Sequence, residues 1–292
     1  MAELLQIKNN TYCFHCNANV GVYKINETDV YFIDSSSRAE TAQDLLETIV
    51  ARGWRLLGII NTHAHADHNG GNAYLQQKTG CKIFCGGLEA AVTENTLLNT
   101  VSLIGGFPPE EFKSSLLYAE ESYVSPFSDP AFPKELEIIY LPGHSADMVG
   151  IRTPDNVVFT ADALISERAA QILHLTYIFD IENQLKTLQK LKGITADIFA
   201  PSHSKATDSI EQLIEINEKL IFSVRDDILK LLNAPLNFED LLAKVVSLYN
   251  IKSSAEQYVL TASTLKNYLG WMKNKELIDF CFINNMLFWK KI

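Results

Sequence analysis

The sequence has little of what marks several large classes of protein. Its 292 residues include five cysteines, far below the density of a disulfide scaffold. No run of about 18 uncharged apolar residues is present, so no membrane span is expected. The N-terminal segment lacks the basic region and apolar stretch of a secretory signal. These absences predict a protein of the reducing cytoplasm that does not enter a membrane.

Basic residues are also scarce. The chain has 25 Lys and Arg against 35 Asp and Glu, a net charge of −10. Residues 1–205 hold 15 basic and 24 acidic residues, whereas residues 206–292 hold 10 and 11. This shift favours a domain boundary near residue 206. Broad binding of nucleic acid requires clustered Lys and Arg, so nucleic acid is a disfavoured partner and a small-molecule substrate is preferred.

The first 205 residues alternate between strand and helix patterns, which predicts an α/β layered domain. We expect strands at 11–14, 20–25, 30–33, 56–60, 82–84, 136–140, 149–153, 157–160 and 197–200, and helices at 39–52, 71–78 and 181–191. Residues 94–134 interrupt this rhythm with prolines and aromatic residues. This aromatic insertion is either a lid over a site or a surface excursion that packs its own side chains.

The last part of the chain is mostly helical. Helices are expected at 209–232, 238–249 and 255–273, followed by two apolar strands around Asn284–Asn285. Helices followed by a hairpin resemble a winged-helix domain, here spanning 206–292. Such a domain binds nucleic acid in some proteins and serves dimerisation or packing in others, so a homodimer is a further alternative for the partner.

A dense group of metal-ligating residue types follows the buried strand 56–60. The pattern is His63-x-His65-x-Asp67-His68, and chance placement of four such residues within six positions is improbable. Imidazole and carboxylate are ligands that zinc and similar metals prefer. Three more ligand-type residues each follow a later strand: His144, Asp162 and His203. Seven ligands are too many for one catalytic zinc and suit two metals about 3.5–4 Å apart.

With these motifs the sequence resembles the metallo-β-lactamase superfamily over residues 1 to about 205, including its glyoxalase II and β-lactamase-like ribonuclease branches. The resemblance implies a four-layer αββα sandwich with the site at one edge of the paired sheets. It implies one metal on His63, His65 and His144, and a second on Asp67, His68 and His203, with Asp162 bridging. Asp34 matches a family aspartate that supports the metal loop without binding metal.

The sequence departs from the family pattern at three places. Ala161 stands where the family usually has glycine before the bridging aspartate, and Ser202 stands where it usually has glycine before the last histidine. The segment 145–148, Ser-Ala-Asp-Met, replaces a commoner run of small residues. No ligand is lost, so the departures concern the shape of the pocket and hence the substrate.

The implied chemistry is metal-dependent hydrolysis. Two divalent ions, zinc in the first instance and iron or manganese as alternatives, lower the pKa of a bridging water towards about 7. The resulting hydroxide attacks an electrophilic carbon or phosphorus, and Asp67 is the catalytic candidate because it can hydrogen-bond the nucleophile as well as bind metal. We expect a small ester, thioester or lactone as the substrate.

Three alternatives remain open from the sequence: a metal-dependent endoribonuclease or phosphodiesterase, a mononuclear iron enzyme of the persulfide-dioxygenase type, and a non-catalytic ligand-sensing protein. True β-lactamase activity is less expected, because enzymes of that activity usually lack the bridging aspartate that Asp162 supplies.

Other chemically interesting residues carry weaker predictions. His174 and Tyr177 follow the Asp162 segment and are candidates for the pocket, although a packed or exposed His174 is the commoner outcome. Cys13-x-x-Cys16 lies in a predicted strand, where residues three apart point to opposite faces. We therefore interpret these cysteines as structural.

Overall fold

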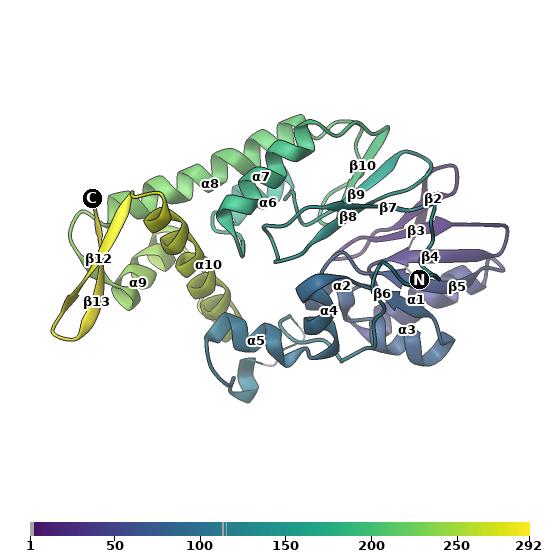
Figure 1. The fold of residues 1–292 in the computed structure, drawn as a ribbon, viewed down its shortest axis with the longest axis horizontal. Coiled ribbons are helices and arrows are strands. Elements are labelled where there is room, and N and C mark those ends of the chain that lie inside the picture. The colour runs from purple at the N-terminus through teal and green to yellow at the C-terminus, as the bar shows by residue number, and fades with distance from the viewer. Residues whose placement is uncertain (1–2, 113, 115) are drawn as a thin grey trace.

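Two β-sheets packed face to face form the centre of the N-terminal region in the computed structural model, which describes residues 3–112, 114 and 116–292 (Figure 1). The larger sheet has the order β1-β2-β3-β4-β5-β6, with β1 (Leu4–Lys8), β2 (Thr11–Phe14), β3 (Val20–Lys24), β4 (Asp29–Ile33), β5 (Arg55–Ile60) and β6 (Lys82–Phe84). The second sheet has the order β10-β9-β8-β7, with β7 (Glu137–Tyr140), β8 (Val149–Arg152), β9 (Val157–Ala161) and β10 (Ile198–Pro201). Both sheets mix parallel and antiparallel pairs.

Side chains of the central strands alternate between the two faces of the larger sheet, so each face contributes to a separate hydrophobic core. In β4, Val30 and Phe32 face helices α1 (Ala39–Val50) and α3 (Asn72–Thr79). Tyr31 and Ile33 point the other way, into the space between the sheets, where they meet Phe159 of β9. Strand side chains alternate with period two, so a strand buried on both faces must be apolar throughout, as β4 is after its first residue.

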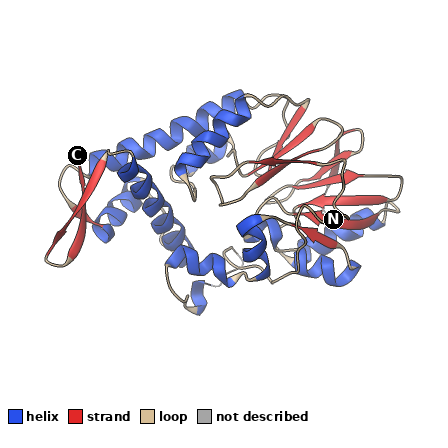
Figure 2. Ribbon diagram, viewed as in Figure 1, coloured by secondary structure: helices blue, strands red, loops and turns tan. Residues whose placement is uncertain are grey.

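Helices α6 (Glu167–Ile172), α7 (Ile181–Lys192) and α8 (Glu211–Leu231) lie on the outer face of the second sheet. The layers are therefore helices, sheet, sheet, helices, with the helices outermost (Figure 2). The expected α/β architecture of two sheets flanked by helices is confirmed. Among the described residues, no helix is both long and apolar enough to cross a membrane.

The C-terminal region extends the outer helical layer. After α8 come β11 (Leu236–Asn237), α9 (Phe238–Leu248), α10 (Ala255–Asn274), β12 (Ile278–Ile283) and β13 (Met286–Lys291), and the three strands pair in the order β11-β13-β12. The side chains of Asn237 and Ser254 cap α9 and α10. Asn284 and Asn285 both adopt positive φ in the hairpin turn, which asparagine tolerates.

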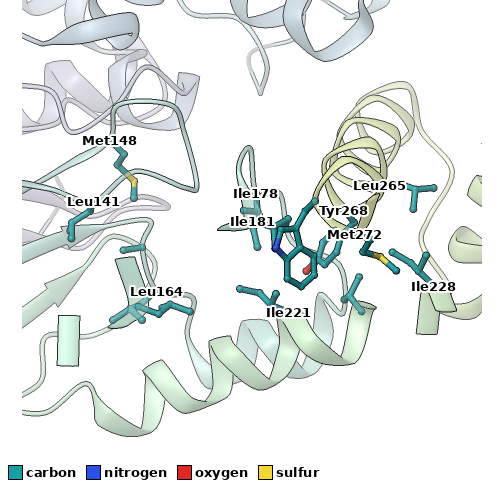
Figure 3. Close-up of a cluster of buried hydrophobic side chains, with 14 of the residues drawn as sticks. Leu141, Met148, Leu164, Ile178, Ile181, Ile221, Ile228, Leu265, Tyr268 and Met272 are labelled. Atoms are coloured by element: carbon teal, nitrogen blue, oxygen red, sulfur yellow. The ribbon is translucent and has the colours of Figure 1, made fainter. Parts of the chain in front are cut away.

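One hydrophobic cluster joins the sandwich to this region (Figure 3). It begins at Leu141 beside β7, includes Ile181 of α7, and continues to Ile221 of α8 and Tyr268 of α10. All four side chains are almost fully buried. Residues 206–292 therefore share a core with the outer helical layer of the sandwich.

Several elements were not expected from the sequence. They are β1, α2 (Ala66–Asn69), α4 (Gly87–Glu94), α5 (Leu97–Ile104), α6 and β11. The region 94–134 contains α5 and the short 3-10 helix Glu110–Phe112 rather than irregular chain throughout. α10 runs from the C-terminal hairpin back to α5, so this insertion contacts the C-terminal region (Figure 1).

Candidate metal centre

Five strand ends converge at one edge of the paired sheets. β4 ends at Ile33 just before Asp34, and β5 ends at Ile60 just before the histidine-rich loop. In the second sheet, β7, β9 and β10 run in the same direction and lead into the loops that carry the remaining candidates, His144, Asp162 and His203. Strands that share a direction release their loops at a common edge, which is why residues far apart in the sequence meet here.

The first group of ligand-type side chains is formed by His63, His65 and His144. Nδ1 of His65 lies 3.0 Å from Nε2 of His63 and 2.9 Å from Nε2 of His144. Three nitrogens at about this separation can share one tetrahedral ion at about 2.0–2.1 Å from each.

The second group is formed by Asp67, His68, Asp162 and His203. Nε2 of His203 lies 3.3 Å from Oδ2 of Asp67 and 3.2 Å from Oδ2 of Asp162. Asp162 also lies 3.3 Å from His68 and 3.4 Å from His144, which belongs to the first group. The structure thus brings all seven predicted ligands together, with Asp162 between the groups.

Two buried polar atoms show that the groups are suited to a metal. Nε2 of His68 and Oδ1 of Asp162 are both buried and lie 3.3 Å apart, yet neither makes a hydrogen bond. Buried polar atoms that make no hydrogen bond are costly, and native proteins rarely keep them without a reason. Imidazole nitrogens and carboxylate oxygens are ligands of zinc, iron and manganese, so the residues fit a two-metal site.

The electrostatics differ between the two groups. In the first, burial lowers the pKa of His144 to about 4 and lowers the pKa of His63 and His65 as well. These imidazoles are therefore neutral and ready to bind metal at neutral pH.

In the second group, burial alone would lower the pKa of His203, but the carboxylates of Asp162 and Asp67 raise it to about 10. Burial likewise opposes the charge of His68, yet Asp162, Asp67 and Asp34 raise its pKa well above the ordinary value. Without metal, these two histidines thus bind protons that neutralise the carboxylates.

Asp34 orients ligands of both groups. Its Oδ2 accepts a hydrogen bond from Nδ1 of His68 at 2.8 Å and another from the hydroxyl of Thr62 at 2.8 Å. Oγ1 of Thr62 in turn lies 3.0 Å from Nδ1 of His63. Hydrogen bonds to the outer ring nitrogen fix which nitrogen is free for the metal. The predicted supporting role of Asp34 fits this geometry.

Glu89 was missed by sequence reasoning. Its buried carboxylate accepts hydrogen bonds from the backbone N–H of Ala64 at 2.9 Å and of Asp147 at 3.0 Å. It therefore ties the loop of His63 and His65 to the loop of His144. A glutamate at the start of a helix is usually a solvated residue, so nothing in the sequence singles it out.

The backbone explains one departure from the family pattern. Ala161 adopts φ of 49°, in the left-handed region that glycine enters most easily. Its methyl group is buried in the core of the outer layer. Ser202, in contrast, is not among the described residues with positive φ. The positive φ at position 161 explains why the family prefers glycine there, whereas the backbone at Ser202 gives no such explanation.

A cavity of about 170 Å³ opens beside the metal ligands. His65, Asp67, His144 and Asp162 line it on one side, and the other side is formed by Asn99, Leu103, Leu116, Leu117, Tyr177 and Leu260. Leu103 belongs to α5 of the insertion and Leu260 to α10 of the C-terminal region. The candidate site is therefore enclosed by three parts of the chain, a juxtaposition that no sequence motif indicated.

The two pocket candidates have different positions. The Tyr177 ring lies 5.5 Å from the His65 ring and 5.9 Å from the His144 ring, within the cavity wall. His174 is exposed and stacks on Tyr249 at 5.7 Å, and it is not among the residues that line the cavity beside the ligands. Its interpretation as a pocket residue is thus not supported by the geometry.

The cysteines take no part in this site. All five are free. Burial raises the pKa of Cys13 to about 12 and of Cys16 to about 11, so both thiols are protonated at neutral pH.

Comparison with known families agrees with the geometry. A family model described as the metallo-beta-lactamase superfamily matches residues 14–203. The chain belongs to this superfamily. Its His and Asp residues are arranged as for a dinuclear metal site.

The chain is also similar, at low sequence identity, to curated hydroxyacylglutathione hydrolases. A hydroxyacylglutathione hydrolase from Bradyrhizobium sp. strain ORS 278 is 29% identical over 159 residues, covering 53% of this chain and 52% of the relative. Another, from Rhodopseudomonas palustris strain BisB18, is 28% identical over 178 residues and covers 59% of each. The chain thus spans little more than half the length of these relatives.

Solved structures support the fold over the whole chain. A metallo-beta-lactamase family protein from Thermus thermophilus is similar with a TM-score of 0.70 at 16% identity, covering 100% of this chain and 98% of that one. A beta-lactamase domain protein from Burkholderia ambifaria gives 0.72 at 12% identity, covering 99% and 94%. At these identities the likeness concerns the fold alone.

Proposed function

We propose that this protein is a metal-dependent hydrolase that cleaves a small ester, thioester or lactone. The main support for this proposal is the cavity of about 170 Å³, which is lined by residues of both ligand groups and by several leucines. Such a cavity accepts the acyl part of a small molecule, and its apolar wall favours a carbonyl compound over a phosphodiester. The distant similarity to hydroxyacylglutathione hydrolases, whose name denotes a thioester substrate, points the same way.

The residues of the site have distinct roles in this proposal. His63, His65 and His144 would hold one divalent ion, Asp67, His68 and His203 a second, and Asp162 would touch both. Bound there, two divalent ions would lower the pKa of a water so that it acts as a nucleophile at neutral pH. Asp67 lines the cavity and would accept a hydrogen bond from that water, which orients it towards the substrate carbonyl.

The C-terminal region supports a packing role better than a nucleic-acid role. Its element order, helix, short strand, two helices and a hairpin, is that of a winged helix, and we propose that 206–292 is such a domain. Three of the lysines that could contact a nucleic-acid backbone are engaged within the chain. Lys273 pairs with Asp279, Lys275 pairs with Glu182, and Lys266 lies over the ring of Phe238.

The decisive experiment is a hydrolysis panel with zinc-, manganese- and iron-reconstituted protein. The substrates are thioesters, lactones, activated phosphodiesters and a single-stranded RNA, and the Asp162→Ala variant is run beside the wild type. Turnover of a thioester or lactone that the variant loses supports the proposal.

Other outcomes of this panel and of metal analysis would favour one of the three alternative functions. RNA cleavage that weakens steeply with salt would show a nuclease. One equivalent of iron with oxygen consumption on a persulfide would show a dioxygenase, and ligand binding that survives His65→Ala without any turnover would show a sensor.

A further inference from the structure

A second cavity adjoins the metal centre and extends the space available to a substrate. Its volume is about 340 Å³, at the low end of the range typical for small-molecule sites. It shares His65, Asn99 and Tyr177 with the cavity beside the ligands, so the two are neighbours. Its own walls are mainly helices α4 and α5, and we refer to it as the α4–α5 cavity.

The lining of the α4–α5 cavity is strongly apolar, and part of it is exposed. Leu88 of α4 is 61% exposed, Leu98 of α5 is 45% exposed, and Phe179, which precedes α7, is 45% exposed. Deeper in, Val92 and Val101 continue the apolar surface. Large exposed apolar side chains that gather around a hollow mark a binding site for an apolar group.

The charge of the two cavities also restricts the ligand. No Lys or Arg is among the described residues that line either one. The ionisable carboxyl groups in their walls are Asp67, Asp162 and Glu89. A glutathione group carries two carboxylates of its own, and no Lys or Arg among the described lining residues could pair with them, so the group would lose hydration without an ion pair to a basic side chain.

We propose that the α4–α5 cavity binds an apolar acyl chain, and that the enzyme prefers medium-chain acyl thioesters or esters with an uncharged leaving group over glutathione thioesters. This inference rests on the proposed function, because it assigns the substrate class of the same site. With the carbonyl carbon beside Asp67, the chain passes His65 and Tyr177 and lies between α4 and α5. Water then adds to the carbonyl, the carbon–sulfur or carbon–oxygen bond breaks, and the carboxylic acid and the thiol or alcohol leave.

The first test varies the substrate and uses the full-length, metal-reconstituted protein. Acetyl, butyryl, octanoyl and dodecanoyl thioesters of N-acetylcysteamine are compared by kcat/KM, and octanoyl-glutathione is compared with octanoyl-N-acetylcysteamine. Burial of each methylene is expected to raise kcat/KM by about threefold until the cavity is full. Octanoyl has six more methylenes than acetyl, so the gain should be on the order of 1000-fold. The glutathione thioester should be the poorer of the octanoyl pair.

The second test fills the cavity. Val101→Trp should lower the octanoyl-to-acetyl ratio of kcat/KM by about tenfold or more, because the indole takes the place of the chain. Val50→Trp is the matched control, since Val50 lies on α1, is 58% exposed and is not a lining residue. Leu98→Arg tests the charge argument at an exposed position that tolerates a polar residue, and it should raise kcat/KM for octanoyl-glutathione.

The outcomes separate this inference from the proposed function. Turnover of thioesters without dependence on chain length, or with glutathione thioesters preferred, overturns the inference and leaves the hydrolase intact. No turnover of any ester, thioester or lactone overturns the proposed function itself. If Leu98→Arg or Val101→Trp changes the oligomeric state in sedimentation instead of the substrate preference, the inference is overturned and the apolar rim belongs to a contact between copies of the chain.

Discussion

The carboxylates of Glu89 and Asp147 each accept a hydrogen bond from the backbone of the other residue's segment. Oε1 of Glu89 accepts a hydrogen bond from the N–H of Asp147 at 3.0 Å, and Oδ2 of Asp147 accepts one from the N–H of Leu88 at 2.7 Å. Because Glu89 also binds the N–H of Ala64, this exchange locks α4 against two of the loops that supply metal ligands. The hydrogen bond from α4 to Asp147 explains why an aspartate stands at this position, in a segment where the family usually has small residues.

The Glu89→Gln variant should therefore be destabilised. An amide can accept only one of the two hydrogen bonds, because its NH₂ group faces the other backbone N–H. Leaving that buried donor unsatisfied costs about 1–3 kcal/mol. Urea denaturation measures the loss, and Glu121→Gln, at an exposed loop carboxylate, is the control. A Glu89→Gln variant as stable as the control would show that the clamp contributes nothing.

Asp34 and Thr62 give a prediction about metal stoichiometry. Asp34→Asn disturbs His68 directly and His63 through Thr62, so the affinity for both metals should fall by about 10–100-fold. Thr62→Val removes the hydroxyl that contacts both His63 and Asp34 but leaves the hydrogen bond between Asp34 and His68, so it should weaken mainly the site of His63, His65 and His144. Thr62→Ser keeps the hydroxyl and serves as the control. Metal titration with elemental analysis distinguishes the variants, and equal loss in all three contradicts the arrangement.

Removal of metal should lower the thermal stability. At free metal about 100 times the dissociation constant, binding stabilises the folded state by about 2.7 kcal/mol. Chelation should then lower Tm by about 5–10 °C in a chain of this size. Scanning calorimetry with and without chelator measures the shift, and Asp162→Ala should show a smaller one. An unchanged Tm in the wild type would argue against a preformed metal site.

The metal-free protein should show a pH dependence that originates at His203. Its carboxylate neighbours raise the pKa to about 10 from an ordinary value of 6.5. A raised pKa stabilises the fold fully below about 6.5 and loses that contribution as the pH rises through about 10. The difference in unfolding free energy between chelated wild type and His203→Gln should thus shrink from pH 6.5 to pH 10. A difference that stays constant over this range would place the protonation elsewhere.

The shared core predicts that the C-terminal region does not unfold alone. Ile221 is 2% exposed and packs in the cluster that includes both Ile181 and Tyr268. Ile221→Ala should cost about 2–5 kcal/mol and shift a single cooperative transition in calorimetry. A chain ending at residue 205 should aggregate, because it exposes the partners of α8 and α10. Two separate transitions, only one of them shifted, would contradict this coupling.

The residues of the two candidate ligand groups, which the structure brings together, could be recognised from the amino-acid sequence alone. His63, His65, Asp67 and His68 are close in the chain, and each later ligand follows a recognisable strand, so local patterns were sufficient. The order of the longer strands and helices was equally predictable, because strands buried on both faces and amphipathic helices leave clear hydrophobic periods. The short elements α2, α4 and β11 were missed because a few residues carry too weak a periodic signal.

The surroundings of the metal centre, in contrast, depend on how distant segments pack. Glu89, Leu103 and Leu260 lie in separate segments that meet at the site because α10 folds back onto α5, and no local pattern encodes that return. Tyr177 joined the cavity and His174 did not, although they are three residues apart. A side chain's place in a pocket depends on long-range packing, whereas its capacity to bind metal depends on its own chemistry.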